Sequence, residues 1–159
     1  MENTAPLRPA DAHARETARR MLAAMRHATL AVIDPGSGHP HLSRILCQAG
    51  ADGGPVALLS ALAAHSRSLA ADPRAGLMID APQDKGDPMT WPRLALQVTA
   101  RPLPDGAPLR AGWQDRHPPS RLFLGLPDFT FWQLVPRSGF LNAGFGAAFH
   151  LAAADLLAP

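Results

Sequence analysis

Apolar residues along this chain of 159 residues recur at two spacings, a helical one near the start and a strand-like one over most of the rest. From residue 12 to residue 26 they fall every three or four positions, which predicts an amphipathic helix with Asp11 as its N-cap. Later runs alternate or stay apolar between turn signals, as strands do. The strands that we expect cover residues 28–34, 43–48, 56–59, 75–79, 93–100, 128–135 and 140–146.

Two of these segments carry the clearest strand signals. Residues 93–100 alternate strictly, so three aliphatic side chains share one face while Arg93 and Gln97 lie on the other. Residues 128–135 are rich in aromatic and β-branched side chains. A proline and a glycine predict a turn over residues 136–139, which separates this strand from the closing one.

Short helical segments interrupt the strands. We expect helical turns over residues 65–69 and 120–125, and a helix over residues 109–117 with Trp113 facing inward. One helix followed by about six strands and short helices is the α+β pattern of a small closed or split β-barrel. Strands do not alternate with long helices, so a doubly wound nucleotide-binding fold is not expected.

The composition fits one globular domain that is large enough to bury a core. Hydrophobic residues make up 47% of the chain and charged residues 18%. We expect residues 1–12, which are rich in Pro and Ala, to be flexible, and residues 13–159 to form the single domain. The net charge of +2 is small and the arginines are scattered, so nucleic-acid binding is not supported.

Signals for secretion, membrane insertion and disulfide bonding are missing from the sequence. No apolar signal-peptide core precedes residue 20, and no stretch reaches the roughly 20 apolar residues of a membrane span. We therefore expect a soluble, cytoplasmic protein that does not bind membranes. Cys47 is the single cysteine, which excludes an internal disulfide, and we expect it to be a small core residue.

The sequence offers few groups for metal binding or catalysis. His39 and His41 could face one side of a strand and bind a metal, but no third ligand is near, so we predict loop histidines and no metal site. Nucleophile elbows, phosphate-binding glycine loops and carboxylate pairs are missing as well. No catalytic residue is identified, which fits a protein whose chemistry comes from a cofactor.

Four polar residues lie at the ends of predicted elements in an order that suits an anion. They are Arg44, Ser60, Ser66 and Arg67. A phosphate is bound by guanidinium groups, hydroxyl donors and free amides at the start of a helix. The alternative is that these are ordinary surface residues at element ends, and the spacing leaves both interpretations open.

The order of short motifs in this chain resembles the FMN-binding split-barrel superfamily, which includes the pyridoxamine-phosphate oxidases. The motifs are Ser-Arg-aliphatic at 43–45, Asp-Gly-Gly-Pro at 52–55, Leu-Leu-Ser at 58–60, His-Ser-Arg-x-Leu at 65–69, Asp-Pro-Arg-Ala at 72–75 and Pro-Arg-Leu-x-Leu-Gln at 92–97. A Gly-Phe-Gly-x-Ala segment at 144–148 is similar to the haem-utilisation branch of the superfamily. The resemblance covers roughly residues 15–151.

This resemblance implies a mostly antiparallel six-stranded split β-barrel with short flanking helices, bound FMN, and a homodimer whose subunits share the cofactor site. It adds two candidate contacts on the strand at 93–100, whose alternative is a solvent-exposed strand face. The cofactor-binding residues that we predict are Arg44, Ser60, Ser66, Arg67, Arg93 and Gln97. The aromatic segment 129–132 is the expected apolar surface of the dimer.

The chain departs from the superfamily pattern in two places. It has no tyrosine and no Arg-x-His element, which pyridoxamine-phosphate oxidases use for their substrate, so we do not expect that enzyme. Haem-degrading relatives typically carry a haem-ligating histidine in an additional C-terminal segment, and His150 is the only histidine in that region here. Three functions remain: a flavin-dependent oxidoreductase of unknown small-molecule substrate, a haem-binding or haem-utilisation protein, and a non-catalytic flavin-binding module.

Overall fold

The computed structural model describes residues 7–81, 83–144 and 146–157. Its strands are β1 (Arg8–Pro9), β2 (His27–Ile33), β3 (Pro40–Ala49), β4 (Pro55–Ser60), β5 (Arg74–Asp80), β6 (Arg93–Leu103), β7 (Phe129–Asn142) and β8 (Ala148–Ala152). Its helices are α1 (Ala12–Ala24), α2 (Ala64–Ala71), α3 (Ala107–Arg116) and α4 (Ala153–Leu156), with the 3₁₀ turns η1 (Pro88–Thr90) and η2 (Pro118–Leu122).

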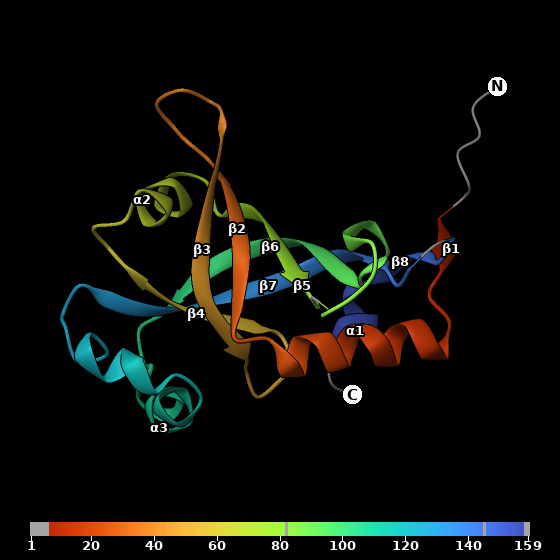
Figure 1. Cartoon of the computed structure of the whole chain (residues 1–159). Coiled ribbons are helices and arrows are strands. Elements are labelled where there is room, and N and C mark those ends of the chain that lie inside the picture. The colour runs from red at the N-terminus through yellow and green to blue at the C-terminus, as the bar shows by residue number, and fades with distance from the viewer. Residues whose placement is uncertain (1–6, 82, 145, 158–159) are drawn as a thin grey trace.

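Six antiparallel strands close into a barrel in the order β7-β4-β3-β2-β5-β6 and back to β7 (Figure 1). The long strand β7 pairs with β6 along one edge. Its other edge pairs first with β4 and then with β8. The two-residue strand β1 runs parallel to β8. The expected α+β fold, a six-stranded antiparallel barrel with short helices, is confirmed.

The barrel interior follows from the alternation of apolar side chains along the strands. Leu30, Leu94 and Leu134 are fully buried at its centre. Helix α1 packs its buried face against this core and lies beneath the barrel in Figure 1. The predicted N-cap is confirmed, because the Asp11 carboxylate accepts a hydrogen bond from the Ala14 amide at 2.7 Å.

A second, smaller apolar cluster lies between β4, β7 and helix α3. Trp113 is fully buried there, as expected, and its ring meets that of Phe131 edge-to-face with 5.2 Å between centroids. Phe131 itself is 3% exposed. It is therefore not available to the dimer surface that residues 129–132 were expected to form.

Strand β7 does not end where the sequence predicted. The expected turn at residues 136–139 is wrong, because β7 continues through it to Asn142. A bulge accommodates Pro136, since the pairing with β6 shifts by one residue between Gln97 and Val98. Of the predicted closing strand at 140–146, residues 140–142 are thus the end of β7, and β8 begins at Ala148.

Two sequence expectations fall partly on residues that the structure does not describe. Residues 1–6 of the expected flexible segment lie outside the described residues, and the flexibility of residues 1–12 stays a prediction. Phe145, in the Gly-Phe-Gly motif, also lies outside them. On either side, Gly144 and Gly146 have φ of 127° and 72°, values that favour glycine. Among the described residues, no helix combines the length and apolar character needed to cross a bilayer.

We predict that the free energy of unfolding falls as the pH is lowered from 7 to 5, in part through His117. Its imidazole is 3% exposed, and burial, reinforced by the charges of Arg26 and Arg116, lowers its pKa. In the unfolded chain, where a histidine has a pKa of about 6.5, this imidazole takes up a proton at lower pH than 6.5, whereas the folded state excludes that proton. The free energy of unfolding that His117 contributes above about pH 6.5 is therefore lost as the pH falls below it. Urea unfolding of the wild type and of His117→Asn at several pH values measures this, and the variant should show a shallower dependence.

The matched control for this prediction is His13→Asn, which changes an exposed histidine on α1. It should keep the wild-type dependence on pH. A His117→Asn variant with the wild-type slope would contradict the assignment.

Candidate functional site

The outer face of the barrel carries small and apolar side chains at the centre of the sheet. Ala31 lies opposite Gly76 across β2 and β5, and Gly76 lies opposite Gln97 across β5 and β6. Around this centre, Met78 and Phe140 are large apolar residues that remain exposed. The outer face is therefore a surface on which a flat ligand or a second protein surface can lie close to the backbone.

A groove of about 730 Å³ opens on this face where β2, β5, β6 and β7 meet. Its polar lining comes from Asp72, Arg74, Gln97, Thr99 and Arg137. Arg74 is already paired, with 2.6 Å between its Nη2 and an oxygen of Asp72, and these hydrogen bonds lower the pKa of Asp72 to about 2. Arg74 and Asp72 therefore largely neutralise each other.

Arg137 is held differently, although it lines the same groove. It is the extra residue of the β7 bulge, because Gln97 pairs with Ser138 and Val98 pairs with Pro136. Its Nε donates to the Thr99 hydroxyl at 2.8 Å. Among the described residues it forms no ion pair. The bulge thus places one uncompensated cation in the groove.

The residues predicted near the start of α2 do lie together. The Ser66 hydroxyl donates to the Ser60 carbonyl at 2.7 Å, and Ser66 and Arg67 line a pocket of about 260 Å³. The two hydroxyls and one nitrogen of the Arg67 guanidinium are engaged within the chain, however. The Ser60 hydroxyl donates to the Asp128 carboxylate at 2.7 Å, and Arg67 Nη1 donates to the Leu62 carbonyl at 2.9 Å.

The other three predicted residues lie on the outer face, Arg44 on β3 next to β4, and Arg93 and Gln97 on β6. Arg44 is exposed on β3 opposite Thr29. Arg93 donates from Nη1 to the Met89 carbonyl at 3.0 Å. Gln97 accepts from the Ser138 hydroxyl at 2.8 Å and lines the groove. The binding role of the six residues stays a prediction.

His150 lies at the far end of the same outer face. It is opposite Phe140 in the pairing of β7 with β8, and the two rings meet edge-to-face with centroids 5.3 Å apart. A pocket of about 520 Å³ adjoins it, lined by Leu7, Pro9, Ala10, Arg15, His150, Ala152 and Asp155. The imidazole is exposed, and among the described residues its side chain has no hydrogen-bond partner.

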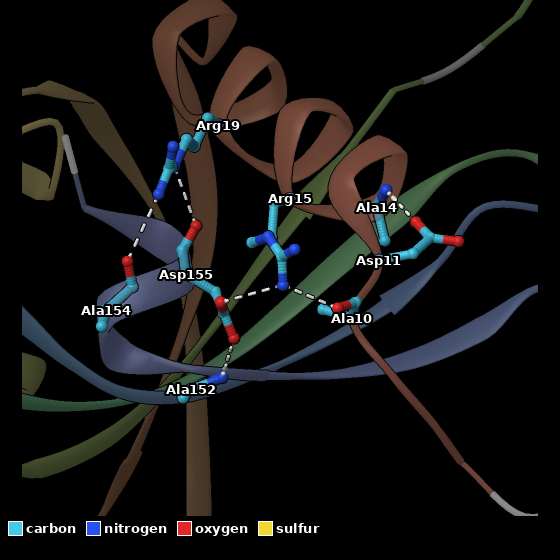
Figure 2. Close-up of polar contacts among 8 residues, drawn as sticks. All are labelled: Ala10, Asp11, Ala14, Arg15, Arg19, Ala152, Ala154 and Asp155. Carbon is cyan, nitrogen blue, oxygen red and sulfur yellow. Dashed lines mark hydrogen bonds and ion pairs between the residues drawn. The ribbon is translucent and has the colours of Figure 1, made fainter. Parts of the chain in front are cut away.

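Polar contacts between α1 and α4 fix the position of this corner (Figure 2). Arg15 Nη1 donates to the Ala10 carbonyl at 2.7 Å and lies 3.5 Å from the Asp155 carboxylate. Arg19 Nε donates to the Asp155 carbonyl at 2.9 Å, and the Ala152 amide donates to the Asp155 carboxylate. These contacts hold the end of β8, and with it the strand that carries His150.

The remaining candidates for chemistry are not supported. Among the described residues, no group of three or more His, Cys, Asp or Glu side chains could hold a metal ion. Burial raises the pKa of the Cys47 thiol to about 12, so this residue is not a nucleophile near neutral pH. The expectation of a core cysteine is confirmed.

Comparisons with known proteins connect this fold to named relatives. No family model matches the chain. One solved structure is 51% identical, covers 96% of this chain and all of its own, and has a TM-score of 0.90. The non-canonical heme oxygenase HOZ of Arabidopsis thaliana is 30% identical over 114 residues, which are 70% of this chain and 34% of that protein. A heme-binding protein from Mycobacterium smegmatis is 30% identical, covers 95% of this chain and 61% of its own, and has a TM-score of 0.81.

A protein of the pyridoxinephosphate oxidase family from Clostridium acetobutylicum has the same fold, with a TM-score of 0.71, 13% identity, and coverage of 92% of this chain and 99% of its own. The fold of this chain is therefore that of the split-barrel superfamily that the sequence motifs resemble. The chain is also similar to two proteins that carry heme in their names. It spans about a third of the length of the Arabidopsis relative and about three fifths of the mycobacterial structure.

Sequence reasoning missed the two arginines of the groove and the role of Arg15. The sequence pattern assigned Arg137 to a turn. Only the pairing of β7 with β6, which skips Arg137, shows that this residue stands in a bulge. Pro136 within a strongly β-forming stretch is the one signal that could have indicated this, because proline inside a strand is confined to edges and bulges.

Proposed function

We propose that this split-barrel protein binds haem on the outer face of its barrel, with His150 as the axial ligand. The Arabidopsis and mycobacterial relatives, both 30% identical to this chain, carry heme in their names. The observation in this chain that supports the proposal is an exposed imidazole on a rigid strand, beside an aromatic ring and an open pocket. Imidazole is a common axial ligand of haem iron.

The residues around His150 suit a planar apolar ligand with acidic groups. Phe140 and Met78 offer apolar contact on the same face, and Gly76 and Ala31 leave the backbone open to close approach. Arg15 lies at the rim of the pocket, where the Asp155 carboxylate largely neutralises its charge. Haem would supply iron redox chemistry, while this chain would bind and orient it.

FMN binding is the second candidate function, with a flavin-dependent oxidoreductase or a non-catalytic flavin module as its two forms. Ser66 and Arg67 near the start of α2 support it, since hydroxyl and guanidinium donors bind phosphate. Asp128 weighs against a role for Ser60 in the present arrangement, because its carboxylate already accepts the Ser60 hydroxyl. The substrate of such an oxidoreductase is not indicated by any residue.

A homodimer is part of the proposal. Four large apolar side chains remain exposed on β2, β3, β5 and β7: Ile33, Leu42, Met78 and Phe140. In an isolated chain, an apolar face of this kind is a common mark of a protein interface. We therefore propose that the dimer surface is the outer face, which a second copy covers, and not the aromatic segment 129–132 that was expected from the sequence. The cytoplasmic location stays a prediction.

The first experiment is haemin titration of the purified protein. We predict a Soret band of a histidine-ligated haem in the wild type and its loss or a marked shift in His150→Ala, because the axial ligand is removed. His39→Ala, which changes an exposed histidine in the β2–β3 turn, is the matched control and should keep the wild-type spectrum. An unchanged spectrum in His150→Ala would remove this residue as the ligand.

The second experiment tests FMN in the same preparation. If FMN binds near α2, the flavin absorbance retained after gel filtration should fall in Arg67→Ala, because a charged phosphate contact is worth about 1.5–3 kcal/mol. Arg121→Ala on η2 is the control and should retain flavin as the wild type does. Failure of the wild type to retain any flavin would remove this candidate.

The third experiment tests the dimer by light scattering at micromolar concentration. The wild type should have the mass of two chains, and Met78→Asp should shift it towards one, because a carboxylate would be buried in the apolar face. Leu122→Asp, on an exposed residue of η2, should not change the mass. A monomeric wild type would contradict the dimer proposal.

A further inference from the structure

We propose that the β7 bulge builds an oxyanion site around Arg137, and that this site takes an acidic group of the ligand bound on the outer face. For haem, that group is a propionate carboxylate. The inference rests on the proposed function for the identity of the ligand, while the oxyanion site itself stands on the groove geometry.

The bulge determines where the Arg137 side chain points. In a regular strand, residues 136, 137 and 138 would alternate between the two faces of the sheet. Here one extra residue is inserted opposite Gln97, and Arg137 is exposed and lines the groove together with Gln97 and Thr99. Bulges that redirect one side chain are frequent beside binding sites.

The guanidinium is anchored at one nitrogen and available at the others. Nε donates to the Thr99 hydroxyl at 2.8 Å, which fixes the plane of the group. The Ser138 hydroxyl donates to the Gln97 Oε1, so the side-chain amide of Gln97 has its NH₂ donors free of that bond. A fixed arginine fork next to an amide donor is suited to the two oxygens of a carboxylate.

The charges around the groove favour an anion. Its charged groups are Asp72, Arg74 and Arg137, and the first two form an ion pair. One positive charge therefore remains, on Arg137. The other walls are apolar and come from Ala31, Ile33, Pro40 and Val98 among others. An anionic ligand with an apolar body fits this lining better than a free inorganic ion.

The groove and His150 lie within reach of one large ligand. His150 is opposite Phe140, which is three residues from Arg137 along β7. With about 3.3 Å per residue along a strand and about 4.8 Å between strands, the two Cα atoms are about 11 Å apart. A tetrapyrrole that is ligated at its centre carries its carboxylates at its rim, so one molecule can meet both residues.

The test compares ligands with and without the acidic group. Binding of haemin and of its dimethyl ester is measured by Soret titration for the wild type, Arg137→Gln and the control Arg101→Gln, whose arginine is exposed on β6 and bonded to Gln133. We expect Arg137→Gln to weaken haemin about tenfold or more and to leave the ester unchanged, as for loss of a charged hydrogen bond. Arg101→Gln should behave as the wild type. Equal effects on both ligands, or none, would overturn the inference.

Two further arms separate this inference from the proposed function. If haemin binds and Arg137→Gln has no selective effect, haem binding stands and the oxyanion site fails. If haemin does not bind, FMN and riboflavin, which differ only in the phosphate, replace the two porphyrins. Selective weakening of FMN by Arg137→Gln would then support the oxyanion site with a phosphate as its ligand. If neither pair of ligands binds, the rise in melting temperature on adding inorganic phosphate is compared between the wild type and Arg137→Gln. An equal rise in both proteins would overturn the oxyanion site.

Discussion

The pairing of β6 with β7 is the interaction on which the rest of this structure depends, because it turns an open sheet into a closed barrel. It runs along the whole of β6 and leaves neither strand with a free edge there. The buried Leu94 and Leu96 point inward only in this register. A slip of one residue would send Arg93 and Gln97 into the core, and the cost of burying such groups without partners makes the register specific. The same constraint requires a bulge where Pro136 cannot pair regularly.

Closure of the barrel also divides the sheet into an inner face, which forms the core, and an outer face, which is exposed and can bind a ligand. Among the described residues, the inner face is filled with buried aliphatic side chains, whereas the grooves and pockets lie on the outer face and at the barrel ends. On the outer face the side chains at the sheet centre are small, and two places combine polar groups with a groove or pocket: the Arg137 groove and the His150 corner. The second depends on α1, because Arg15 and Arg19 hold α4 and the end of β8 in place.

Much of the fold could be predicted from the sequence, because helical spacing in α1 and strict alternation in β6 reflect their burial directly. The path of the chain at 136–139 could not be predicted, because proline and glycine are typical of turns and bulges alike. Only the pairing with β6, which is distant in the sequence, decides between the two. The site was harder still. Ser60, Ser66 and Arg67 were correctly grouped because α2 follows β4 closely in the chain. Their engagement by Asp128 and by backbone carbonyls depends on long-range packing, which no local pattern encodes.

That engagement bears on the choice between the two cofactors. A phosphate that replaced the Asp128 carboxylate at Ser60 would have to displace a 2.7 Å hydrogen bond and then lie beside a like charge. No such rearrangement is needed for an apolar macrocycle on the outer face, where the imidazole of His150 is exposed and the guanidinium of Arg137 is fixed without a carboxylate partner among the described residues. The two sites therefore differ at Ser60 and Ser66, whose hydroxyls already donate within the chain, whereas Arg67 and Arg137 each keep guanidinium nitrogens beyond the one that is bonded.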